Sequence, residues 1–284
     1  MTAAPPHRFA TQEASRALDL TFRRQRGRTR LGEQRVRYPF HITRPFHFDT
    51  AVAPGLATLY LQSASGGYYR GERLLARVRA EPGAEVCVTT QASTIVHHAR
   101  GTATVADTRI EAEAGSVVFH MPDPLILLPG ADLLTTLTVR RAPDAAAVVS
   151  EAFLAHDPDG EGQPFARLDN EIRIETPDGV PEAIDRMVVD VDGLSVARRL
   201  GGTIAAGGVL IVGPQAAAAD PLAVEAGLGP IDGARLAVSR LPFDCGLTVR
   251  IAAGSGRELT AALDASFAAA FRLIYGGEPA RRRK

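Results

Sequence analysis

Lysine is nearly absent from this sequence. The only lysine is Lys284, the last of the 284 residues, and arginine supplies all the other cationic side chains apart from seven histidines. A phosphate-binding P-loop needs a lysine before its serine or threonine, and Schiff-base catalysis needs an amine that can be desolvated. The body of the chain therefore excludes both kinds of chemistry.

Cysteine, net charge and long apolar runs are also scarce. The two cysteines, Cys87 and Cys245, form neither a disulfide framework nor a CxxC motif, which indicates a reducing compartment. Basic and acidic residues balance at 32 each, so the chain has no net field to hold nucleic acid or an acidic membrane surface. No secretory signal or membrane-spanning run is present. We expect a cytoplasmic protein that binds neither nucleic acid nor membrane.

Short apolar stretches, many of them alternating with polar residues, fill the chain from Leu18 to Ala253 and predict strands. Turn sequences recur between them, such as EPGAE at 81–85 and TPDG at 176–179, which favours a meandering or coiling antiparallel sheet over βαβ units. We predict one large, mainly β domain over residues 18–276, with a flexible segment at 1–17 and a basic tail at 277–284.

Two helices are predicted near the end of the chain. Asp220 as N-cap and Pro221 open a short one that we expect Gly227 to close. The longer helix begins at Ser255, which forms a capping box with Glu258, and runs to about Tyr275. Its apolar residues fall on one stripe that must be covered, namely Leu259, Leu263, Phe267, Phe271 and Ile274.

Histidines are the first candidates for a metal site, because imidazole suits nickel. His97 and His98 are the only adjacent pair. Neighbouring residues on a strand face opposite sides, so the pair cannot chelate one ion without a bulge, and ordinary histidines are the favoured interpretation. The alternative is a nickel carrier built on His97, His98 and His120.

Three further patterns have a structural and a functional interpretation. The glycine-rich stretch 201–214 precedes a strand instead of opening a helix, so hairpin glycines are favoured over a dinucleotide site. The DPDGEG segment at 157–162 lacks the remaining ligands of a calcium loop, which favours a solvated turn. An arginine cluster is either a solvated strand face or an anion or partner patch, and comprises Arg23, Arg24, Arg26, Arg28 and Arg30.

An enzyme remains an alternative class of function. A β-solenoid or sandwich hydrolase would use two carboxylates across one cleft with separated pKa values. The candidates for such a pair are Glu72, Asp123, Asp157 and Glu171.

Five motifs in order give the sequence a family resemblance: GRTRL at 27–31, RPF at 44–46, SGGYYRGE at 65–72, TTQASTIVHH at 89–98 and PDPLILLPGADL at 122–133. In these motifs the chain resembles the UreD (UreH) family of urease accessory proteins. It departs from the family's usual pattern at Glu72, where aspartate is usual, and at Ile95, where lysine is usual. The motif residues are Arg28, Arg44, Gly66, Gly67, Gly71, Glu72, Thr89, Thr90, Gln91, Pro122, Asp123 and Pro124.

The resemblance implies a coiled or layered, β-helix-like sheet with two helices, the longer near the C-terminus. It implies a non-enzymatic scaffold that is required for nickel insertion into apo-urease and acts with a UreF-type protein and a UreG-type GTPase. Nickel would then be the transferred ion, with no tightly bound cofactor. The proline-bracketed run Leu125, Ile126, Leu127 and Leu128 is the candidate partner contact, presented at an edge or in a loop, or else a plug of the sheet core.

Overall fold

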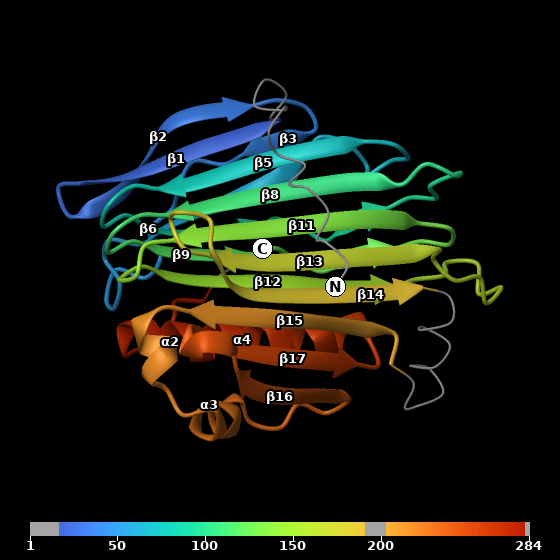
Figure 1. The fold of residues 1–284 in the computed structure, drawn as a ribbon. Coiled ribbons are helices and arrows are strands. Elements are labelled where there is room, and N and C mark those ends of the chain that lie inside the picture. The colour runs from blue at the N-terminus through green and yellow to red at the C-terminus, as the bar shows by residue number, and fades with distance from the viewer. Residues whose placement is uncertain (1–16, 191–202, 282–284) are drawn as a thin grey trace.

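The computed structural model describes residues 17–190 and 203–281, which form two large β-sheets with helices on one side (Figure 1). The first sheet has seven strands in the order β14, β13, β11, β8, β5, β1, β2. Their bounds are β1 Leu18–Gln25, β2 Arg28–Val36, β5 Arg73–Ala80, β8 Thr104–Ala112, β11 Asp132–Arg141, β13 Arg167–Glu175 and β14 Pro181–Asp190.

The second sheet has ten strands, eight of them in the order β16, β17, β15, β12, β9, β6, β4, β3, while β10 pairs with β12 and β7. Their bounds are β3 Phe40–Ile42, β4 Ala57–Ser63, β6 Glu85–Thr90, β7 Thr94–Val96, β9 Val117–Met121, β10 Leu125–Leu127, β12 Ala146–Ala155, β15 Ala205–Val212, β16 Ala234–Arg240 and β17 Gly246–Ala253. The mainly β fold is confirmed.

From β4 to β13 the chain alternates between the two sheets, so strands that neighbour each other within a sheet belong to successive coils. The pairs β5–β8, β8–β11, β6–β9 and β9–β12 are all parallel. The expectation of an antiparallel sheet was therefore wrong for the central strands. It holds for outer pairs such as β1–β2, β13–β14 and β15–β17. The arrangement is β-solenoid-like, as the family resemblance implied.

The turn EPGAE at 81–85 is one of the stacked corners of this coil, whereas TPDG at 176–179 is a hairpin between the antiparallel strands β13 and β14. Gly83 and Gly115 both have a positive φ, 68° and 63°, at equivalent places in two corners. The backbone N–H of Gly83 donates to the carbonyl of Ala114 (2.9 Å), and that of Val117 donates to Ala84 (2.9 Å). A tight turn with a left-handed glycine has the same local sequence whether the next strand joins the same sheet or the opposite one. Local sequence alone could not distinguish the two.

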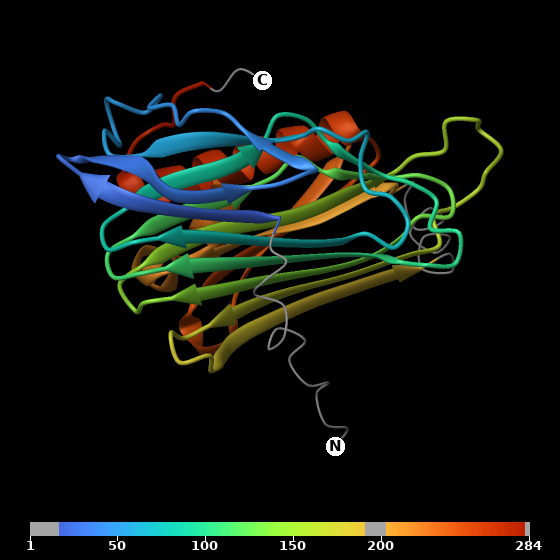
Figure 2. The ribbon, with the colours of Figure 1, turned by 90° about the horizontal axis from the view of Figure 1, so that it is seen from above.

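Helix α4 (Gly256–Tyr275) covers the outer face of the second sheet (Figure 2). Ser255 accepts a hydrogen bond from the N–H of Glu258 (3.3 Å), and Gly276 ends the helix in the left-handed conformation at φ 75°. Phe267 and Phe271 pack against Phe119 of β9 at ring-centroid distances of 5.3 and 6.1 Å. The predicted N-cap at Ser255 and the predicted need for a cover over the apolar stripe are confirmed, but Oε2 of Glu258 has no hydrogen-bond partner among the described residues, so the return half of the capping box is not seen.

Three shorter helical elements complete the described part of the fold. They are α2 (Pro214–Ala218), α3 (Pro221–Leu228) and the 3-10 helix η2 (Pro242–Asp244). Asp220 caps α3 by accepting from the N–H of Leu222, as predicted, but the helix continues through Gly227 and ends before Gly229, at φ 69°. Helix α2 was not predicted because a single turn has no apolar period. Among the residues described, no helix is both long and apolar enough to cross a membrane.

The two predicted terminal segments are only partly described, since residues 1–16 and 282–284 lie outside the described ranges. Residues 277–281 follow α4 and fold back onto the loop after β3. There the N–H of Ala280 donates to Asp49 (2.7 Å), and Arg272 pairs with Glu278 (3.0 Å). This first part of the predicted tail is therefore docked on the sheet.

Of the two alternatives for the run 125–128, the structure favours the plug of the sheet core for Leu125–Leu127, while Leu128 follows the strand. Strand β10 lies between β12 and β7 and pairs in parallel with both. Leu127 is 1% exposed and packs in a cluster with Phe153 and Phe165, whereas Ile126 is half-buried. The bracketing prolines fall outside the three paired residues, so they do not interrupt the pairing. Leu127 belongs to the core.

We expect Leu127→Asp to unfold the protein, because the substitution buries an unpaired charge at a cost above about 4 kcal/mol. The matched control is Leu222→Asp on α3, where the side chain is 74% exposed and the change should stay within about 0.5 kcal/mol. Urea denaturation followed by circular dichroism measures both. A Leu127→Asp protein with wild-type stability would show that this residue is not part of the core.

Candidate functional site

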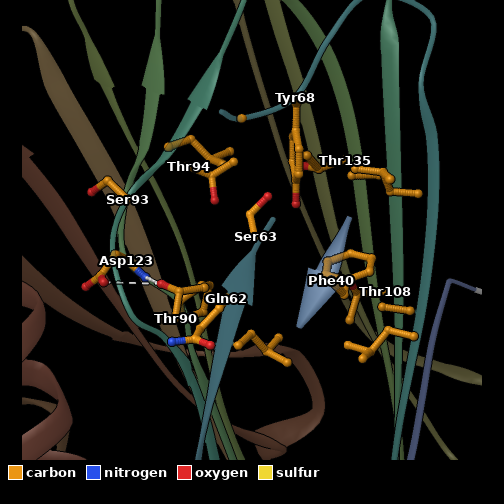
Figure 3. Close-up of a pocket in the computed structure, with 18 of the residues that line it drawn as sticks. Phe40, Gln62, Ser63, Tyr68, Thr90, Ser93, Thr94, Thr108, Asp123 and Thr135 are labelled. Atoms are coloured by element: carbon orange, nitrogen blue, oxygen red, sulfur yellow. Dashed lines mark hydrogen bonds between the residues drawn. The ribbon is translucent and has the colours of Figure 1, made fainter. Parts of the chain in front are cut away.

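A cavity of about 340 Å³ lies between the two sheets and opens at one end of the strands (Figure 3). Protein interiors rarely leave voids much larger than a water molecule, so this space needs a cause. The inward side chains of β5 and β8 are small here, with Ala76, Ala106 and Thr108 lining the cavity. The stacked strands keep the sheets apart while these side chains leave the space between them unfilled.

The opening is formed by the loops that follow β4 and β6. Ser63, Gly66, Gln91 and Ser93 line the cavity and are exposed to solvent. Figure 3 shows the side chains of Ser63, Tyr68 and Thr94 pointing into the space. The motif residues SGG and TTQ, which are far apart in the sequence, therefore meet at one opening.

The wall beside this opening is fixed by a reciprocal pair of hydrogen bonds between Thr90 and Asp123, one of which is drawn in Figure 3. The hydroxyl of Thr90 donates to Oδ2 of Asp123 (3.2 Å) and accepts from its backbone N–H (2.8 Å). The hydroxyl of Thr89 donates to the carbonyl of Met121 (2.7 Å). These bonds hold the PDP segment against the end of β6.

Gly67 shows why the motif at the opening requires glycine. Its φ is 136°, and a Cβ there would lie 2.2 Å from the carbonyl oxygen of Ile95. A side chain would push the turn away from β7. Glu72 holds the other end of the turn by accepting from the N–H of Tyr69 (3.0 Å). Six of the twelve motif residues line this cavity, namely Gly66, Gly67, Thr90, Gln91, Pro122 and Asp123. Four more adjoin them in the same loops and strands, whereas Arg28 and Arg44 lie elsewhere.

Glu151 is one of the acidic residues that line the cavity, together with Asp107 and Asp123. It is enclosed by protein, and burial raises the pKa of its carboxyl from 4.5 to about 7. His120 lies on the same inward face of the second sheet, because Val149 pairs with His120 and Glu151 is two residues further along β12. Burial lowers the pKa of His120 to about 4, so the imidazole is neutral at pH 7. Burial, with Glu151 and Glu72 nearby, raises the pKa of Tyr68 to about 12.

A second, much smaller space of about 10 Å³ lies on the far side of Glu151. Gly208 of β15 pairs with Glu151 on one side and with Arg250 of β17 on the other, and its missing side chain leaves this gap. Beyond it Arg250, half-exposed, forms an ion pair with Asp185 (2.6 Å). Glu151 therefore lines both spaces. It lies between the main cavity and the ion pair of Arg250 with Asp185.

Three buried polar atoms beside these two spaces have no hydrogen-bond partner within the described part of the protein: Nδ1 of His120, Oγ1 of Thr135 and Oδ1 of Asn170. Buried polar groups are normally satisfied by protein or by ordered water. Thr135 and His120 line the main cavity, and Asn170 lines the smaller one. These three atoms can therefore bond to water inside the two spaces.

The predicted histidine pair does not form a joint site. His97 stacks on Tyr69 (4.4 Å between ring centroids) and its Nε2 is 3.1 Å from the carbonyl of Gly66. His98 packs against Gly130, and its Nδ1 accepts from the N–H of Arg100 (2.9 Å). No cluster of three or more His, Cys, Asp or Glu residues suited to a metal ion occurs within 17–190 and 203–281.

The four carboxylates proposed for a hydrolase are also held by separate partners. Asp157 accepts from the N–H groups of Gly162 and Gln163, which makes 157–162 a self-capped turn. Glu171 pairs with Arg173 (2.8 Å) on β13. Glu72 and Asp123 bond within the loops described above. The structure does not gather them into one catalytic pair.

Sequence reasoning missed Glu151 and Gly208. A single carboxylate inside the apolar run AAAVVSEAFLA was the available signal, since an unpaired charge in a buried strand is expensive. Gly207 and Gly208 were read as hairpin glycines, but both lie within strand β15. Only the register shows that Gly208 stands beside Glu151.

Comparison with known proteins places the chain among its relatives. The model of the UreD urease accessory protein family matches residues 14–284. The chain is 42% identical over 270 residues to urease accessory protein UreD 1 of Methylorubrum populi, which covers 93% of this chain and 90% of that protein. It is 38% identical over 261 residues to UreD 3 of a Bradyrhizobium species (91% of each) and 36% identical over 267 residues to UreD 1 of Pseudomonas syringae (89% and 90%).

The raised pKa of Glu151 predicts a pH-dependent stability. Below about pH 4.5 the carboxyl is protonated in both states; between 4.5 and about 7 only the unfolded state ionises, so stability falls as the pH rises. Over this window the loss amounts to at most about 3 kcal/mol. We expect Glu151→Gln to unfold like the wild type at pH 4.5 and to be more stable at pH 8, measured by urea denaturation. The control is Glu171→Gln, which changes an ion-paired carboxylate at the surface. If Glu151→Gln and the wild type differed in stability by the same amount at both pH values, the raised pKa of Glu151 would be contradicted.

Proposed function

Because the chain belongs to the UreD family of urease accessory proteins and so has an accessory role in urease maturation, we propose that it is the scaffold required for nickel insertion into apo-urease. Its relatives are named as accessory proteins, in agreement with a non-enzymatic role. It acts in a complex with a UreF-type protein and a UreG-type GTPase, and it docks on apo-urease. Nickel is its cargo and not a resident cofactor.

The observation that carries this proposal is the interior cavity with Glu151 at its inner end. The space is open at the SGG and TTQ loops, lined by both hydroxyl and apolar side chains and enclosed by two sheets. An ion in this space is shielded from competing ligands in bulk solvent. The smaller space beyond Glu151 and the pair Asp185–Arg250 extend the line toward the opposite surface. Nickel passes along this interior line.

The side chains on the line suit brief binding. Carboxylate and neutral imidazole are both ligands for nickel, and Glu151 and His120 supply one of each. A transferred ion must bind strongly enough to enter and weakly enough to leave. An incomplete ligand set that water completes meets both conditions, whereas a closed site of three or four protein ligands would retain the ion.

A cytoplasmic location is part of the same proposal, and the free thiols of the buried Cys87 and Cys245 support it. Leu125, Ile126 and Leu128 stay candidates for a partner contact, since they are half-buried around the core residue Leu127. The direct carrier built on His97 and His98 is less favoured, because the two rings bond to different neighbours.

Two substitutions test the interior line. Glu151→Ala removes the carboxylate, and Gly208→Val fills the gap between Glu151 and Arg250, where an added Cβ lies 3.5 Å from the guanidinium. We expect both variants to fold and to bind their partners, yet to lower the nickel content of urease about tenfold when they replace the wild-type protein in cells. Atomic absorption on purified urease gives the readout.

Glu171→Gln on the outer face of β13 is the matched control and should give fully loaded urease. Full nickel loading with both interior variants would rule out the interior route. Normal urease activation in cells that lack this protein entirely would rule out the accessory role itself.

A further inference from the structure

The end of the molecule that holds β1, β2 and β3 is strongly basic, although the chain as a whole is neutral. Residues 17–48 contain eight arginines and only two carboxylates, Asp19 and Glu33. The rest of the chain therefore carries six more acidic than basic residues, since the totals are equal at 32. Figure 1 shows this end farthest from β16.

Elsewhere on the first sheet most arginines form ion pairs, and the exposed Arg73 of β5 is an exception. Arg77 bonds to Asp19, Arg140 to Glu175 and Arg186 to Asp169, each at 2.9 Å. At the basic end Arg23 and Arg24 reach Glu81 and Glu85. The other arginines of this end form no ion pair with a described residue; they are exposed and comprise Arg26, Arg28, Arg30, Arg35, Arg37 and Arg44.

The register of β1 and β2 places like charges side by side. Arg30 lies directly opposite Arg23, and Arg28 is on the same face two residues away. Arg35 lies opposite Asp19, again on this face, but Asp19 is already bonded to Arg77. Like charges directly opposite each other in a sheet are destabilising. Glu81 pairs with Arg23, but Arg28 and Arg30 form no ion pair with a described residue. An arginine row without its own countercharges is the pattern of a surface that meets carboxylates from another molecule.

Exposed aromatic rings lie at the same end. Phe46 and Phe48 are 42% and 36% exposed and stack on each other (5.2 Å between centroids). His47, between them, is held to β2 by Nε2, 3.1 Å from the carbonyl of Thr29. Arginine and aromatic residues are enriched in protein interfaces, where they act as anchors. The stacked rings are therefore held at the surface, where a partner can contact them.

We propose that this basic–aromatic end, formed by Arg28, Arg30, Arg35, Arg37, Arg44, Phe46 and Phe48, docks an acidic protein surface of one of the urease maturation partners. The occupant carries clustered carboxylates beside apolar side chains, which matches the arginine row and the ring pair. A protein is favoured over a nucleic acid because the rest of this chain is net acidic and repels a long polyanion. The inference rests on the proposed function, which supplies the set of partners, and it accounts for the two motif residues, Arg28 and Arg44, that lie away from the cavity.

The test is a charge reversal. We compare the full-length wild type, Arg28→Glu/Arg30→Glu, and the control Arg235→Glu/Arg257→Glu, which reverses two exposed arginines remote from the basic end. Each is titrated with purified apo-urease, UreF-type protein and UreG-type protein at low and at physiological salt. We expect the first pair to weaken binding of one partner by about tenfold or more and to reduce its salt dependence, with the control unchanged. Arg37→Glu/Arg44→Glu repeats the test outside the strand.

The outcomes separate the possibilities. Unchanged binding of all three partners by both basic-end variants overturns the inference while leaving the proposed function intact; a wild type that binds none of the three sinks the proposed function. Sedimentation that shows self-association of the wild type, lost in the variants with partner binding unaffected, would assign the surface to a second copy. If the wild type bound heparin tightly and in a salt-sensitive manner, and the basic-end variants lost this binding, the surface would be assigned to a polyanion.

Discussion

Parallel pairing between strands of successive coils is the constraint on which the structure depends. A strand such as β5 finds its partner β8 only after the chain has crossed to the opposite sheet and returned. Every backbone hydrogen bond of the central strands is therefore long-range, and the stacked corners fix the register. Because side chains alternate with a period of two, that register decides which residues face each other across the interior.

The cavity follows from this register and from side-chain size. Small residues recur at the same level of neighbouring coils, for example Ala76 beside Thr108, and the sheets cannot collapse onto them because the core on either side holds them apart. Glu151 at this level is unfavourable for stability, since burial raises its pKa to about 7. A carboxylate kept in such a place at a stability cost points to a role in function, and nickel transfer is the role that we propose for it.

Two regions of the molecule divide the motif residues between them. Residues of the SGG, TTQ and PDP motifs line the cavity near its opening, and there their role is geometric: Gly67 permits a close approach and Asp123 fixes a wall. Arg28 and Arg44 lie at the basic end, where the role of the side chain is its charge. The proposed role in nickel insertion uses both regions, the interior as a path and the basic end as a surface for a partner.

The sequence by itself determined the local structure. The alternation of apolar and polar residues predicted the strands, and the capping residues Ser255 and Asp220 predicted where two helices begin, because these signals act within a few residues. Parallel pairing, the inclusion of β10 between two strands, the meeting of Glu151 with Gly208 and the row of arginines on β2 required the tertiary structure. Each depends on strand register across the fold, and the free energy that selects a register comes from contacts between residues far apart in the chain.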